Sequence, residues 1–269
     1  MLIKFSLKNK YSLITGAAGL LGGMHAHALA EINSNLILTD LNVKLLLRLK
    51  KEILKSFPKI NIFCFKMDIT KHVEILNVVK KLKRKKINID VLINNADLNS
   101  DFKSLNNKEN KLENFSLEYW EKNIRVGLTG TFLCSKIIGT DMSKRKGGVI
   151  LNISSDLSVI SPNNDIYKSK KKQNYKPVSY STVKTGIVGL TKYIATYWAK
   201  KNIRCNALSP GGVYNKQDKI FINKLKKLIP MNRMANKNEY ISTVQYLCTD
   251  ASSYLTGQNI VLDGGRSIW

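Results

Sequence analysis

Tyr11-Ser-Leu-Ile-Thr15 runs directly into Gly16-Ala17-Ala18-Gly19-Leu20-Leu21-Gly22, and residues 26–32 continue with helical character. The first five residues predict a short buried strand, so the order is strand, glycine-rich turn and helix. Glycines let the backbone approach a pyrophosphate closely, and the free N–H groups at the start of the helix favour a negative charge there. This stretch therefore predicts the beginning of a dinucleotide-binding fold.

A second predicted strand, residues 36–40, ends in the carboxylate of Asp40. An acid about twenty residues after a glycine turn can accept hydrogen bonds from both hydroxyls of an adenosine ribose. The same charge would repel a 2′-phosphate, so Asp40 favours NAD over NADP. Nearby Lys44 and Arg48 could reach a 2′-phosphate, so NADP is the alternative cofactor.

Strands and helices alternate along the rest of the chain. Predicted strands cover residues 60–66, 91–93, 149–153 and 204–208, and predicted helices cover 73–82, 117–142 and 178–200. Such alternation predicts a parallel sheet covered on both faces, with ligands at the carboxyl ends of its strands. The expected fold class is α/β, a single-domain Rossmann-like doubly wound parallel sheet flanked by helices, over residues 1–269.

Tyr180-Ser181-Thr182-Val183-Lys184 carries acid/base chemistry. A Tyr and a Lys spaced i, i+4 share one face of a helix. The ammonium favours phenolate over phenol, so it should lower the pKa of Tyr180 toward the working pH.

The ordered set of motifs resembles the short-chain dehydrogenase/reductase family from about residue 8 to the C-terminus. The matching segments are the glycine turn, Asp40, Asp68, Asn94-Asn95-Ala96, Asn152-Ile153-Ser154-Ser155, Tyr180 with Lys184, Pro210-Gly211, Leu255-Thr256-Gly257-Gln258 and Asp263-Gly264-Gly265.

The resemblance implies a role for each matching residue. Tyr180 would be the general acid/base, Lys184 would lower its pKa, and Ser155 would hold the substrate oxygen, with Ser154 as the alternative. The expected cofactor contacts are Gly16, Gly19, Leu20, Leu21, Gly22, Asp40, Asp68, Ile69, Asn94, Ala96, Tyr180, Lys184, Pro210, Gly211 and Val213. No metal is expected.

The implied function is NAD(P)-dependent interconversion of a secondary alcohol and a ketone on a small molecule. Four further segments resemble a subgroup found with flagellin-modification and surface-sugar biosynthesis proteins, so a sugar or amino-sugar substrate is expected. They are residues 176–180, 210–215, 233–236 and 265–269. The alternatives are a 3-oxoacyl-carrier-protein reductase and a catalytically decayed relative that acts as a nucleotide-binding partner subunit.

Three departures from the family pattern have expected consequences. The glycines fall as Gly-x-x-Gly-x-x-Gly rather than Gly-x-x-x-Gly-x-Gly, which predicts a slightly different turn. Gly127 replaces an Asn that helps to hold a proton-relay water in the family, so Gly127→Asn should leave turnover unchanged or increase it and should raise Tm. Residues 161–177, with the basic run Lys168 to Lys172, lengthen the segment between Ser155 and Tyr180 and form either a substrate lid or a solvated loop.

Composition sets the remaining expectations. The net charge is +25, yet no stacking aromatics accompany the basic run at residues 80–86, so no nucleic-acid partner is expected. Four scattered cysteines favour reduced thiols in the cytoplasm, and no apolar run reaches the length of a membrane span. Excess apolar residues on the two long predicted helices favour a homodimer or homotetramer. They are Ile124, Leu128, Phe132, Ile187, Leu190 and Ile194.

Overall fold

The computed structural model describes residues 5–98, 110–168 and 173–269. Its centre is a seven-stranded sheet in the order β3-β2-β1-β4-β5-β6-β7, and every neighbouring pair is parallel. The strands are β1 (Tyr11–Thr15), β2 (Asn35–Asp40), β3 (Ile62–Lys66), β4 (Val91–Asn94), β5 (Gly148–Ile153), β6 (Ile203–Pro210) and β7 (Asn259–Leu262). This confirms the expected fold class.

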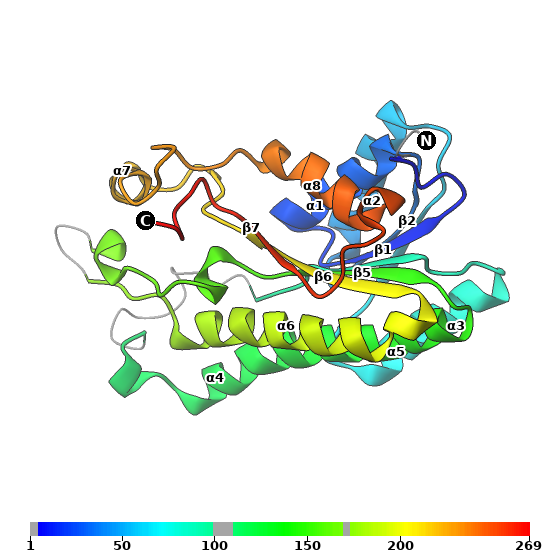
Figure 1. Cartoon of the computed structure of the whole chain (residues 1–269), viewed down its shortest axis with the longest axis horizontal. Coiled ribbons are helices and arrows are strands. Elements are labelled where there is room, and N and C mark those ends of the chain that lie inside the picture. The colour runs from blue at the N-terminus through cyan, green and yellow to red at the C-terminus, as the bar shows by residue number, and fades with distance from the viewer. Residues whose placement is uncertain (1–4, 99–109, 169–172) are drawn as a thin grey trace.

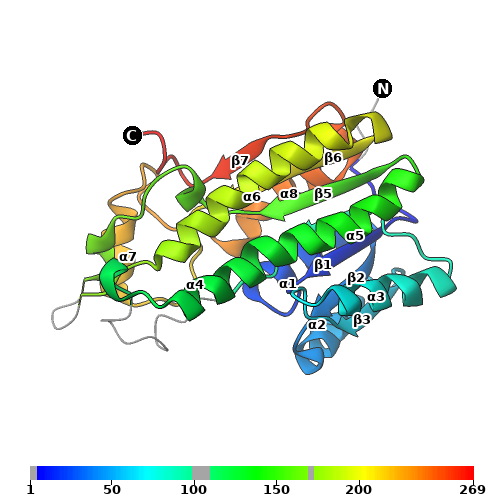
Figure 2. The same cartoon turned by 90° about the horizontal axis from the view of Figure 1, so that it is seen from below.

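Helices cover both faces of the sheet (Figures 1 and 2). One face carries α1 (Leu20–Glu31), α2 (Val43–Ser56) and α8 (Ile241–Cys248), and the other carries α3 (His72–Arg84), α5 (Gly130–Lys144) and α6 (Val178–Tyr197). Successive strand residues point to opposite faces. Ile14 of β1 therefore packs under the first set of helices while Leu13 packs under the second.

The helix predicted over residues 117–142 is a helical run of three parts. It consists of α4 (Leu117–Asn123), a π-helical segment η2 (Ile124–Thr129) and α5. Gly127 is buried in η2. Segments of π-helix are uncommon and are frequently found beside functional sites.

A small cap lies beyond the carboxyl ends of the strands, at the left of Figure 1. It consists of α7 (Lys219–Lys226) and the 3₁₀ segment η4 (Asn164–Tyr167), joined by a cluster of Ile166, Leu225, Ile229 and Met234. Among the described residues, no helix combines the length and the apolar character needed to span a membrane.

Candidate active site

A cavity of about 1160 Å³ opens at the carboxyl ends of the central strands. Its lining brings together nearly all of the predicted site residues. Those that line it are Gly16, Gly19, Leu20, Leu21, Gly22, Asp40, Asp68, Ile69, Ala96, Ser155, Tyr180, Lys184, Pro210, Gly211 and Val213.

The glycine turn packs tightly against the end of β4. Gly16 has a φ of +62°, and a Cβ at this position would lie 2.7 Å from the Ala96 Cα, so a side chain is excluded. Asn95 fixes the turn, because its Nδ2 donates to the Thr15 and Gly16 carbonyls at 3.0 and 3.1 Å. Helix α1 starts after Gly19 with no capping side chain and no acidic residue in its first turn. Its first N–H groups therefore suit the pyrophosphate of a dinucleotide.

Asp40 stands at the end of β2 beside this turn. Its Oδ2 accepts a hydrogen bond from the Ala18 N–H at 3.1 Å, and its Oδ1 accepts one from the Asn42 N–H at 2.9 Å. These bonds fix the carboxylate at the cavity wall, where the hydroxyls of an adenosine ribose would fit.

Asn94 is the predicted cofactor contact that does not line the cavity. It is buried under the sheet end, and its Nδ2 donates to Ser135 Oγ at 2.9 Å and to Asn152 Oδ1 at 2.8 Å. The Asn94 side chain therefore points into the interior, and its expected contact with the cofactor stays a prediction. The next residue, Asn95, lines the cavity instead.

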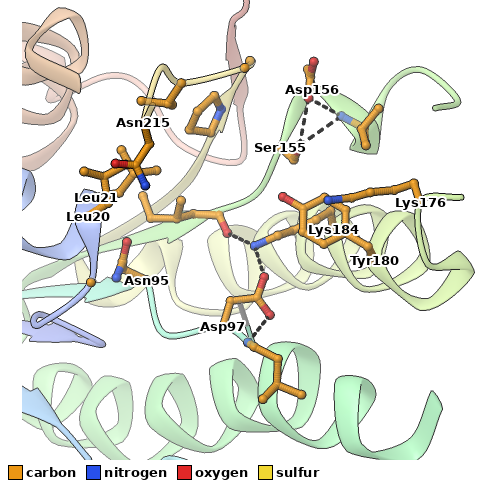
Figure 3. Close-up of a pocket in the computed structure, with 18 of the residues that line it drawn as sticks. Leu20, Leu21, Asn95, Asp97, Ser155, Asp156, Lys176, Tyr180, Lys184 and Asn215 are labelled. Atoms are coloured by element: carbon orange, nitrogen blue, oxygen red, sulfur yellow. Dashed lines mark hydrogen bonds and ion pairs between the residues drawn. The ribbon is translucent and has the colours of Figure 1, made fainter. Parts of the chain in front are cut away.

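Ser155, Tyr180 and Lys184 face one another across the cavity (Figure 3). Ser155 follows β5, and its Oγ donates to Asp156 Oδ1 at 2.8 Å. The Lys184 Nζ lies 5.5 Å from the centre of the Tyr180 ring and donates to the Ile153 carbonyl at 3.2 Å. Ser154 also lines the cavity, but its Oγ donates to the Lys184 carbonyl at 2.8 Å, so Ser155 is the better placed of the two hydroxyls.

The pKa of Tyr180 departs from the sequence expectation. Burial raises the pKa of this phenol, and the nearby Lys184 ammonium lowers it only in part, so the net shift is upward. Burial alone would lower the pKa of Lys184, but the Asp97 carboxylate and Tyr180 together raise it above its ordinary value. The expected depression of the Tyr180 pKa is therefore wrong.

Comparison with known proteins agrees with this geometry. A family model described as enoyl-(acyl carrier protein) reductase matches residues 16–267. The chain belongs to the short-chain dehydrogenase/reductase family. Membership confirms the enzyme class expected from the sequence, an NAD(P)-dependent oxidoreductase.

Three relatives show how widely the similarity extends along this short-chain dehydrogenase/reductase. An NAD-dependent glycerol dehydrogenase of Listeria innocua is 30% identical over 98% of this chain and 96% of its own. A 3-oxoacyl-[acyl-carrier-protein] reductase of Aquifex aeolicus is 29% identical over 98% and 99%. The crystal structure of a short-chain type dehydrogenase/reductase from Mycobacterium marinum is 26% identical, with a TM-score of 0.85 over 99% and 98%.

Three charged residues beside the short-chain dehydrogenase/reductase motifs were not predicted from the sequence. Asp97 forms an ion pair with Lys184, and Asp156 forms one with Arg266. The Lys176 Nζ lies 3.6 Å from the centre of the Tyr180 ring, and burial is the main cause that lowers the pKa of Lys176 to about 8. Both acids could have been found from the sequence. Asp97 and Asp156 closely follow the ends of β4 and β5, and ligands bind at the carboxyl ends of parallel strands.

Gly127 does not leave the vacancy that the family comparison suggested. A Cβ at this position would collide with Val183 Cγ1 and would lie 3.1 Å from Asp97 Oδ1. The space of an Asn side chain is therefore already occupied. The expectation that Gly127→Asn raises Tm is wrong on these contacts.

The longer segment between Ser155 and Tyr180 contributes to the cavity wall. Its described lining residues are Ile166, Tyr167, Lys168, Asn174 and Lys176. Residues 169–172 of the predicted basic run lie outside the described residues. The described part of the segment thus forms part of the cavity wall rather than a loop remote from the cavity.

Proposed function

We propose that the protein interconverts a secondary alcohol and a ketone on a small hydroxylated substrate of the sugar or amino-sugar class, with NAD as its cofactor. The observation that carries the proposal is the meeting of Ser155, Tyr180 and Lys184 in the same cavity as the glycine turn and Asp40. The resemblance to flagellin-modification and surface-sugar proteins supplies the setting, biosynthesis of a surface or flagellin glycan.

Each proposed catalytic residue has one task. When bound, the nicotinamide accepts or donates a hydride at the carbinol carbon. The Tyr180 hydroxyl exchanges the proton of the substrate oxygen, and the Ser155 hydroxyl holds that oxygen. Lys184 places a positive charge beside Tyr180 and so favours phenolate, the form that abstracts a proton during alcohol oxidation.

NAD is the proposed cofactor because the Asp40 carboxylate stands where a 2′-phosphate would be repelled. Lys44 and Arg48 are exposed on α2 and are not among the residues that line the cavity. The relative from Listeria innocua is named an NAD-dependent glycerol dehydrogenase, which supports this choice. Because glycerol is a small polyol, the same relative supports a small polyhydroxylated substrate.

Charged groups around Tyr180 favour a hydrophilic substrate over a long acyl chain. Asp97, Asp156 and Lys176 all line the cavity within the neighbourhood of this ring. An acyl chain offers no hydrogen bonds to these groups, whereas the hydroxyl groups of a polyol or sugar can donate to the carboxylates and accept from Lys176. The acyl-carrier reductase remains the alternative, supported by the Aquifex relative.

A hydride-transfer screen tests the proposal. The purified protein is given polyols, sugar phosphates, nucleotide sugars and 3-oxoacyl thioesters, each with NAD(H) and NADP(H), and nicotinamide absorbance is followed. Tyr180→Phe keeps the ring and removes the hydroxyl, so the best activity should fall by roughly two to four orders of magnitude. Turnover on acyl thioesters alone would favour the reductase, and tight NAD binding without turnover would favour the decayed relative.

We also infer a homodimer or homotetramer, on a surface that includes Phe132 from the expected set but not Ile187 or Ile194. Ile187 and Ile194 are buried inside the subunit. Phe132, Tyr193 and Tyr197 remain exposed on the outer faces of α5 and α6, which lie side by side in Figure 2. Light scattering at micromolar concentration tests this, and a monomer would contradict it.

The proposed setting is the cytoplasm, with one domain over residues 1–269. All four cysteines are free, and three of them are buried. Unpaired thiols suit a reducing compartment.

A further inference from the structure

Asp97 contacts the catalytic-site lysine directly (Figure 3). Its Oδ2 lies 2.8 Å from the Lys184 Nζ, and the side chains of Asp97 and Lys184 are 23% and 5% exposed. Its Oδ1 accepts a hydrogen bond from the Leu98 N–H at 2.9 Å, which fixes the carboxylate. The lysine also donates to the Ile153 carbonyl, so its ammonium is held between an acid after β4 and the backbone of β5.

The carboxylate fits because residue 127 is glycine. A Cβ there would lie 3.1 Å from Asp97 Oδ1, closer than ordinary van der Waals contact. It would also collide with Val183, the neighbour of Lys184 on α6. A side chain at residue 127 and an acid at residue 97 would therefore compete for one space between η2 and α6.

We propose that Asp97 is a positioning residue that orients the Lys184 ammonium and thereby sets the pH at which Tyr180 gains or loses its proton, and that the lack of a side chain at Gly127 makes room for it. The proposal rests on the proposed function of Tyr180 as the acid/base. A charged oxygen in direct contact takes the place next to the lysine that the resemblance assigns to a water held by Asn.

The sign of the effect follows from the charges that face Tyr180. Asp97 partly neutralises Lys184, so phenolate is less favoured than it would be beside the ammonium alone. Asp156 acts in the same direction as Asp97, and Lys176 lies over the ring with the opposite charge. Within the described part of the chain, the charged and titratable groups around Tyr180 are Asp97, Asp156, Tyr167, Lys176, Lys184 and Arg266.

The decisive variant is Asp97→Asn, which keeps the shape and removes the charge. The carbon-13 signal of Tyr180, labelled at its ζ carbon and assigned with Tyr180→Phe, should then titrate at lower pH than in the unmutated protein. The acidic limb of kcat for alcohol oxidation should move the same way. Asp97→Ala also removes the orienting contact, so its kcat should fall by roughly tenfold to a hundredfold with little change in cofactor affinity.

Asp141→Asn is the matched control. Asp141 pairs with Lys83 and Arg145 away from the cavity, so its loss should leave both pH profiles unchanged. A Tyr180 titration in Asp97→Asn that coincides with that of Asp141→Asn would overturn the proposal. The NMR readout needs no substrate, so a protein inactive in every hydride-transfer assay would contradict the proposed function while a shifted titration still upheld this inference.

A second variant covers the case in which Asp97→Asn does not fold. Val183→Ala removes the collision at residue 127, and Gly127→Ala in that background pushes a methyl group against the carboxylate. Displacing Asp97 from Lys184 should shift the Tyr180 titration toward acid relative to Val183→Ala alone. An unchanged titration would contradict the proposal.

Discussion

Replacing Arg266 by Met should destabilise the fold by leaving a buried carboxylate without its countercharge. The Arg266 Nη1 lies 2.7 Å from Asp156 Oδ2, and the two side chains are only 8% and 5% exposed. Breaking a buried pair from one side typically removes about 3–5 kcal/mol of stability. Asp156 would keep the Ser155 hydroxyl and the Leu157 N–H as donors, so the expected loss lies near the lower value, about 3 kcal/mol.

The assay is thermal unfolding by circular dichroism, with denaturant titration as a second measure. A change of 1 kcal/mol moves Tm by about 2–4 °C in a protein of this size, so Arg266→Met should lower Tm by roughly 6–12 °C. Arg233→Met is the matched control, because Arg233 pairs with Glu239 at the surface, where ion pairs contribute little. The double variant Arg266→Met/Asp156→Leu should regain stability, since no uncompensated charge remains. An Arg266→Met protein that melts within a degree or two of Arg233→Met would refute the reasoning.

Three further predictions concern Asp40, Gly127 and His25. Asp40→Ala should narrow the preference for NAD(H) over NADP(H), which calorimetry with both cofactors measures; equal affinity for the two in the unmutated protein would remove the charge argument. Gly127→Asn should lower Tm, because overpacking against Val183 typically removes about 1–3 kcal/mol, and a higher Tm would show that α6 moves aside. His25 is buried, and burial lowers its pKa from 6.5 to about 3. Below pH 6.5 the unfolded chain therefore binds a proton at His25, whereas the folded chain does not bind it until the pH approaches 3. Stability should therefore fall between pH 6.5 and 3 more steeply than in His25→Leu, and parallel pH curves would contradict this.

The sheet was predictable where apolar runs and turn residues mark the strands. Residues 11–15, 36–40, 91–93 and 149–153 lie in β1, β2, β4 and β5 and are buried except for Tyr11, Asp40 and Val149, which are half-buried. Helices α2, α7 and α8 and strand β7 have no counterpart among the predicted elements. Strand β7 is a half-buried edge strand, and α7 is short and buries only Leu225, so neither has a long apolar pattern.

The candidate site divides in the same way. Site residues that short sequence motifs mark could be predicted. Gly16 of the glycine turn and the i, i+4 pair Tyr180 and Lys184 are examples, and all three line the cavity as expected. The ion pair of Lys184 with Asp97 could not be predicted in this way, because tertiary packing alone brings Asp97, which follows β4, beside Gly127 of η2 and Lys184 of α6. The upward shift of the Tyr180 pKa likewise depends on burial, which no spacing reveals.

The order of the strands has a consequence for synthesis on the ribosome. Strands β1 to β4 occupy one continuous half of the sheet, and β5, β6 and β7 join it one after another at the β4 edge. The dinucleotide turn is therefore framed by the first segment to emerge, while the proton-transfer residues arrive later with β5 and α6. Until β5 is translated, the backbone of β4 is an unpaired template for strands of other chains. The extent of co-translational aggregation should therefore depend on the time that the ribosome takes from the end of β4 to the end of β5.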